Sequence, residues 1–206
     1  MSNYESAARE IWKLWYEKDY RPLIDAVKES IKEHIKAFGE KNPNKKVYGY
    51  SIYTCNGFPH FGPVLNTTEE LEKNDFDPYY KYCADEWSDW DDYSCFEKPK
   101  ELLECLHQEF DECMQKFEDI YEEGEYLINE ESELYWEKNV EKVYDSVNLA
   151  LKELVSEGEF DWLDTDNKLI LIWFSDPSSW EFSLAKDSVE ALVGENEANE
   201  FSATLQ

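Results

Sequence analysis

Apolar residues recur at helical spacing in four long stretches of the chain, residues 4–16, 21–38, 99–122 and 133–156. The spacing places the apolar side chains of each stretch on one face and the polar side chains opposite. In the second stretch this stripe consists of Ile24, Val27, Ile31, Ile35 and Phe38. The pattern therefore predicts four amphipathic helices that pack one face against a core.

A hairpin of two strands is predicted after the second helix. Residues 47–54 (VYGYSIYT) are rich in β-branched and aromatic residues, and Gly49 leaves room for a group packed closely on one face. The Asn56-Gly57 pair predicts the turn. Because proline donates no ladder hydrogen bond, Pro59 and Pro63 predict that the return segment is an edge strand or a broken strand.

Shorter segments complete the prediction. Residues 79–83 have the composition of a short strand, and residues 168–174 (KLILIWF) are continuously apolar, which is typical of a central strand covered on both faces. Thr67 and Glu70 have the spacing of a capping box for a short helix over 68–74. A last helix is expected at 186–193.

No fixed-period repeat and no linker rich in Pro, Gly or Ser divides the chain. The fold class predicted is α+β, a single domain over residues 1–194 with a small, mostly antiparallel central sheet flanked by several amphipathic helices. Residues 195–206 are expected to be a flexible acidic tail.

Charge is distributed unevenly along the 206 residues. The net charge is −28, yet residues 1–50 contain ten Lys+Arg and eight Asp+Glu, so residues 51–206 contain ten against forty. A soluble domain needs a net charge of only about 2 to 8. One interpretation is a solvated surface, and the other is a surface that attracts a basic protein. The same field repels phosphates, which argues against direct binding of nucleic acid.

Several classes of function find no support in the sequence. No apolar run approaches the ~20 residues of a membrane-spanning helix, and the N-terminus lacks the pattern of a secretory signal. The five cysteines are an odd number without a C-x-x-C pair, which favours free thiols in a reducing compartment. We therefore expect a soluble cytoplasmic protein without a membrane partner. No nucleophile elbow, phosphate-binding loop or zinc-binding motif occurs, so no enzyme activity, cofactor or metal is predicted.

The most unusual segment is residues 85–96, DEWSDWDDYSCF, in which five carboxylates alternate with aromatic residues. Trp87 and Trp90 could be core residues, as buried tryptophans commonly are. Alternatively, an aromatic ring could anchor a partner while the carboxylates pair with its Arg or Lys side chains. Both interpretations hold if the rings face inward and the acids outward.

Landmarks along the chain resemble a known family. They are Tyr53-Thr54 at the end of a strand, residues 63–71 (PVLNTTEEL), Tyr79-Tyr80-Lys81-Tyr82 followed by Glu86-Trp87, and Glu157-Gly158-Glu159-Phe160 ahead of Ser175-Asp176. This order is similar to the bacterial family catalogued as domain of unknown function 4303, over about residues 11–193. The resemblance implies an immunity protein that neutralises a toxin by binding. Where many relatives have a proline near residues 85–87, this chain is acidic.

The leading hypothesis is an acidic immunity or antitoxin protein that binds a cationic toxin domain, such as a nuclease. The expected contact residues are Asp85, Glu86, Asp89, Trp90, Asp91, Asp92 and Tyr93. A second hypothesis is a small-molecule-binding or hydrolytic domain with an aromatic pocket formed by Tyr50, Tyr53, His60 and Trp173. A third is a regulator that mimics nucleic acid and occupies a basic groove.

Overall fold

The computed structural model describes the backbone of residues 3–90, 94–121 and 128–205, and the side chains of residues 10–90, 94–117 and 135–205. The elements follow in the order α1 (Asn3–Tyr16), α2 (Arg21–Lys41), β1 (Val47–Thr54), β2 (Phe61–Thr67), α3 (Thr68–Lys73), α4 (Pro78–Tyr82), η1 (Ala84–Glu86), β3 (Asp89–Trp90), η2 (Ser94–Phe96), α5 (Glu97–Tyr121), α6 (Ile128–Ser156), β4 (Leu169–Phe174), α7 (Ser179–Leu192) and α8 (Glu195–Leu205).

The strands form one four-stranded sheet in the order β3-β2-β1-β4. Strand β1 is antiparallel to β2 and parallel to β4, and the short β3 is antiparallel to β2. Helices surround this sheet, so the predicted α+β class with a small, mostly antiparallel sheet is confirmed. The four long helices also form over nearly the predicted residues.

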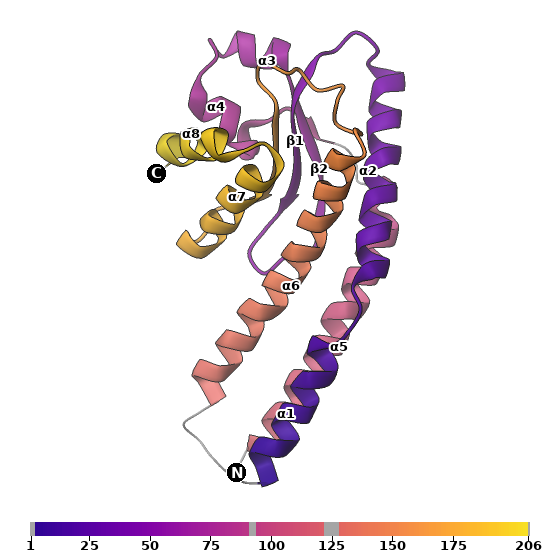
Figure 1. Cartoon of the computed structure of the whole chain (residues 1–206), viewed down its shortest axis with the longest axis vertical. Coiled ribbons are helices and arrows are strands. Elements are labelled where there is room, and N and C mark those ends of the chain that lie inside the picture. The colour runs from indigo at the N-terminus through magenta and orange to yellow at the C-terminus, as the bar shows by residue number, and fades with distance from the viewer. Residues whose placement is uncertain (1–2, 91–93, 122–127, 206) are drawn as a thin grey trace.

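The long helices extend well beyond the sheet (Figure 1). At that end α1 lies along α5, and the contact is made by a separate aromatic cluster of Trp12, Trp15, Phe110 and Phe117. The ring planes of Trp12 and Trp15 are nearly perpendicular at a centroid distance of 5.8 Å. The molecule thus has a main core around the sheet and a smaller aromatic core in the helical extension.

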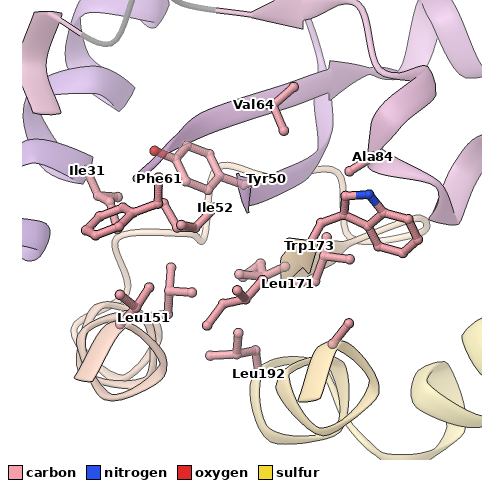
Figure 2. Packing of buried hydrophobic residues seen from close by; sticks show 14 of the residues in the cluster. Ile31, Tyr50, Ile52, Phe61, Val64, Ala84, Leu151, Leu171, Trp173 and Leu192 are labelled. Carbon is pink, nitrogen blue, oxygen red and sulfur yellow. The ribbon is translucent and has the colours of Figure 1, made fainter. Parts of the chain in front are cut away.

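The two faces of the sheet pack against different helices (Figure 2). On one face Tyr50 and Ile52 lie near Ile31 of α2 and Leu151 of α6. On the other face Trp173 lies next to Ala84 of η1. Side chains alternate along a strand, so the two faces receive different residues of β1 and β4. All these side chains belong to one continuous core.

Gly49 has the role that its position in β1 predicts. A Cβ atom at this position would lie 2.6 Å from Cη2 of Trp87, whose side chain is 2% exposed. The indole therefore packs directly on the β1 backbone. Trp87 fixes the segment after η1 against the sheet, in agreement with its interpretation as a core residue.

The segment predicted as a strand at residues 79–83 is instead helix α4. Asp77 is its N-cap and accepts a hydrogen bond from the Tyr79 backbone N at 3.0 Å, and Pro78 occupies the first helical position. Both are helix-start signals, and here they outweigh the β propensity of the tyrosines.

Strand β4 was expected to be central, and this is wrong, because β4 is the last strand in the sheet order. Its six residues are nevertheless all buried. Helix α7 covers the outer edge, where the Ser188 hydroxyl accepts the Ile172 N–H at 2.9 Å and donates to the Ala185 carbonyl at 2.6 Å. The helix thus satisfies a backbone donor that a neighbouring strand would otherwise bind.

Strand β2 was expected to be an edge or broken strand, but it is continuous and lies between β1 and β3. Pro63 is tolerated within this strand because β3 pairs only with Val64 and Leu65. Pro63 lies beyond these pairs, so no hydrogen bond to β3 is lost at its position.

The expected flexible tail at 195–206 is wrong for the described residues 195–205, which form helix α8. Its Phe201 is fully buried and stacks on Phe182 of α7 at 5.3 Å, with Trp173 and Tyr82 at 6.1 and 5.9 Å. The C-terminal helix is therefore part of the domain.

None of the five cysteines, all of which lie in the described part of the chain, forms a disulfide; Cys83 is buried and Cys105 exposed. Within the described part of the chain, every helix is too short or too polar to cross a membrane.

Candidate functional site

The segment between α4 and β3 carries the candidate contact residues at the surface. It leaves α4, passes through η1 and joins the sheet edge as β3, with Trp87 buried between these two elements. Because Trp87 packs on Gly49, the residues on either side of it are held at defined positions. The segment is therefore a fixed part of the surface.

Asp85 lies at the centre of this surface. Its carboxylate accepts a hydrogen bond from the Tyr53 hydroxyl at 2.6 Å and another from Trp173 Nε1 at 3.0 Å. Tyr53 and Trp173 are register partners on β1 and β4, so both reach the same side of the sheet. Hydrogen bonds to an ionised acceptor are among the stronger ones in proteins. The exposed carboxylate is thus held in place by two strands.

Trp90 supplies an exposed ring beside Asp85. Its side chain is 42% exposed. The ring meets Tyr53 edge-on at a centroid distance of 4.7 Å, and its Nε1 donates to the Trp87 carbonyl at 2.6 Å. These contacts restrict both side-chain torsions, so binding a partner through this ring costs little conformational entropy. Unlike Trp87, Trp90 therefore does not have the predicted inward orientation.

The other predicted acids differ in their availability. Glu86 is exposed, and its carboxylate has neither a hydrogen bond nor an ion pair within the described residues. Asp89 is half-buried and paired with Lys45 Nζ at 3.1 Å. Asp91, Asp92 and Tyr93 lie outside the described residues. We define the acidic aromatic site as Tyr53, Asp85, Glu86, Trp90 and Trp173.

Negative charge continues from this site onto α8. Lys81 of α4 is paired with Glu197, and the Tyr82 hydroxyl lies 2.9 Å from Glu197 and 3.1 Å from Glu200, so it can donate its one hydrogen to either carboxylate. Burial, and then these two carboxylates, raise the pKa of Tyr82 well above its ordinary value. Lys81 is thus already paired with an acid of α8. The local surface keeps its negative sign.

The aromatic pocket of the second hypothesis does not form as one group. Tyr50 is fully buried on the other face of the sheet, where its hydroxyl lies 3.0 Å from His34 Nδ1. His60 is exposed in the loop after the hairpin turn. Tyr53 and Trp173, in contrast, are joined through Asp85. Of the four residues, only Tyr53 and Trp173 lie together, and both belong to the acidic aromatic site.

A simple sequence signal could have separated these residues. Tyr50 and Tyr53 are three positions apart in one strand, and side chains at odd separations point to opposite faces of a sheet. The pairing of Tyr53 with Trp173 has no such local signal, because it depends on the register between strands more than a hundred residues apart.

The fold and the site together define a mixed α+β domain with an exposed, rigidly held acidic and aromatic surface. The family model for domain of unknown function 4303 matches residues 27–193, which is most of the chain. The chain belongs to this family. Helices α1 and α8 lie outside the matched residues. Comparisons with curated proteins and with solved structures find no match.

Proposed function

We propose that this protein is an acidic binding protein of the immunity or antitoxin class, which neutralises a cationic toxin domain by direct contact. The observation that carries the proposal is the Asp85 carboxylate, held by Tyr53 and Trp173 beside the exposed ring of Trp90. The net charge of −28 supports the sign of the partner. We further propose that the protein acts in the cytoplasm, where its target would otherwise be active.

A cationic side chain of the partner fits this site chemically. An Arg or Lys placed over the Trp90 ring gains a cation–π interaction and can pair with Asp85 or Glu86 at the same time. The two internal hydrogen bonds of Asp85 keep its carboxylate oriented, so little order has to be created on binding. Tryptophan is enriched among the residues that dominate binding energy at protein interfaces.

The negative charge of the chain favours a toxin with a basic substrate groove, such as a nuclease, as the target. A nuclease domain needs a basic groove to hold phosphates, and an acidic protein competes for that groove electrostatically. Complementary charge accelerates association by about 10 to 10³-fold at low salt. Rapid capture is an advantage for an inhibitor that must act before the toxin reaches its substrate.

The test begins with capture of the tagged protein's partner from a lysate of its own cells at low and moderate salt. Mass spectrometry should identify one stoichiometric basic protein. The activity of that purified protein is then measured with increasing amounts of this chain. Wild-type protein should abolish the activity at about one equivalent.

Two variants locate the interface. Trp90→Ala and Glu86→Lys should each weaken inhibition by about tenfold or more, the loss expected for a hot-spot contact. Glu101→Lys makes the same charge change at an exposed position on α5 and should leave inhibition nearly unchanged. Equal losses from both charge reversals would show general electrostatic attraction only, and unaltered inhibition by Trp90→Ala would contradict the proposed site.

A further inference from the structure

A hollow lies at the tip of the β1–β2 hairpin, and it shares no residue with the acidic aromatic site. In Figure 1 this turn extends alongside α6. The hollow is bounded by the turn, α5 and α6, and its lining residues are Asn56, Gly57, Pro59, His107, Phe110, Asp111, Trp136 and Asn139. It thus combines aromatic walls with polar groups.

A hydrogen-bond relay determines the orientation of Asn139 at this hollow. The Phe58 carbonyl can only accept, so His107 Nε2, at 3.0 Å, must carry a hydrogen. In the neutral ring Nδ1 is then an acceptor, and it lies 3.4 Å from Asn139 Nδ2. The Asn139 amide therefore directs its NH₂ group to His107. Its Oδ1 is left as an acceptor.

Asn139 Oδ1 has no hydrogen-bond partner in the described structure, although the residue is only 3% exposed. A buried acceptor without a partner is uncommon in native proteins, because desolvation of a polar group is costly unless a hydrogen bond replaces its water. Asn139 lines the hollow, so a small movement of its amide would let an occupant with an N–H or O–H donor satisfy this oxygen.

The walls of the hollow favour a flat occupant. Trp136 is 40% exposed, and its ring packs so closely on the turn that a Cβ atom at Gly57 would lie 2.9 Å from Cζ2. The absence of a Cβ at Gly57 allows this close approach, and glycine adopts the positive φ of 82° at this position without strain. Asp111 adds an exposed carboxylate at the rim.

We infer that this hollow binds a small planar nitrogen compound, neutral or cationic, that donates N–H to Asn139 Oδ1 while its ring packs on Trp136. An amidine or an amino-substituted heteroaromatic base has this chemistry. The acidic field of the chain, with a net charge of −28, disfavours a phosphorylated nucleotide, because like charges repel. The site is independent of the proposed inhibitor function.

Three probes of similar shape test the inference. Benzamidine carries N–H donors and a positive charge, benzamide carries donors without charge, and benzoate carries neither a donor nor a positive charge. Binding is measured by ligand-observed NMR titration at about 0.15 M salt, where long-range attraction is largely screened. Benzamidine should bind with a Kd of about 1 mM, the range for a ligand of this size, and benzamide more weakly. Benzoate should not bind.

Variants distinguish the hollow from general attraction to an acidic protein. Trp136→Ala and Asn139→Leu should each weaken benzamidine binding by about fivefold or more. Trp162→Ala removes a tryptophan of matched exposure, 39%, from another part of the surface and should have no effect. Thermal unfolding of each variant checks that it is folded. If Asn139→Leu proves unstable, Trp136→Ala alone tests the inference, because Trp136 is exposed and its replacement should not unfold the protein.

Any of three results would overturn the inference. They are benzamidine binding equally to wild type and Trp136→Ala, benzoate binding as tightly as benzamidine, or no binding of any probe. None of these results bears on inhibition of a toxin, which is measured with the Trp90 and Glu86 variants. The two proposals can therefore fail separately.

Discussion

At the scale of single residues, the site depends on how closely Trp87 packs on β1. The indole occupies the space that a side chain at residue 49 would need. On one side of Trp87 lies Asp85, and on the other lies Trp90, whose Nε1 is bonded to the Trp87 carbonyl. Any displacement of Trp87 would therefore move both candidate contact residues.

Substitution of Gly49 by Ala should destabilise the fold by about 1–3 kcal/mol, because the added methyl group overlaps the Trp87 ring. Urea unfolding measures the change. Gly39→Ala is the matched control, since a Cβ there meets nothing within 4 Å and the residue lies inside α2. That variant should be more stable than wild type by about 0.5–1 kcal/mol. A neutral Gly49→Ala variant would show that Trp87 can move freely.

At the scale of elements, α2 and α6 are joined by a chain of ion pairs at one end. Arg21 of α2 places two guanidinium nitrogens 2.6 and 2.9 Å from the carboxylate of Glu153 on α6, and Lys28 lies 2.7 Å from the same group. Arg21, followed by Lys28, lowers the pKa of Glu153 to about 2 from its ordinary value of 4.5. This contact connects the beginning of α2 to the last turns of α6.

The lowered pKa gives the contact a defined pH dependence. A carboxyl group whose folded pKa is depressed stabilises the fold fully above its unfolded pKa, and the contribution is lost as the pH falls towards the folded value. Glu153→Gln should therefore lower the melting temperature at pH 7, and the difference from wild type should shrink between pH 4.5 and about 2. Differential scanning calorimetry across this range measures it.

Glu137→Gln removes an exposed carboxylate elsewhere on α6 and provides the control. Its melting temperature should stay close to wild type at every pH. If the Glu153→Gln difference were the same at pH 7 and pH 3, the ion pairs would not be its cause.

At the same scale, local sequence patterns predict some elements correctly and others not. The stripe of α2 is reproduced, with Val27 and Ile31 fully buried, because a helical period depends only on neighbouring residues. The strand prediction at 79–83 was wrong because two local signals conflict there. Asp77 and Pro78 favour the start of a helix, whereas the tyrosines favour a strand, and the sequence pattern does not show which preference is stronger. The position of β4 in the sheet also had no local signal.

At the scale of the whole molecule, the dominant property is the net charge of −28. Like charges on a compact surface repel each other, and the repulsion is relieved when the chain expands. Salt shortens the range of this repulsion, from about 30 Å at 0.01 M to about 8 Å at 0.15 M. The acidic surface therefore reduces stability at low ionic strength.

The melting temperature should rise when NaCl is increased from about 0.01 M to about 0.15 M at pH 7. The same titration near pH 4.3, the isoelectric point calculated from the sequence, should give little or no rise. A fall at pH 7 would mean that ion pairs such as Arg21–Glu153 contribute more to stability than the repulsion removes. Thermal scanning by intrinsic fluorescence suits this test, because the chain contains eight tryptophans.

The sequence by itself determined the helix faces, the hairpin, the fold class, the family and the sign of the surface charge. Each of these depends on composition or on residues close together in the chain. Only the tertiary structure decided that Asp85 joins Tyr53 to Trp173, that Trp90 faces outward while Trp87 is buried, and that residues 195–205 pack as a helix. These outcomes depend on strand register and on contacts between distant segments, which local patterns do not encode.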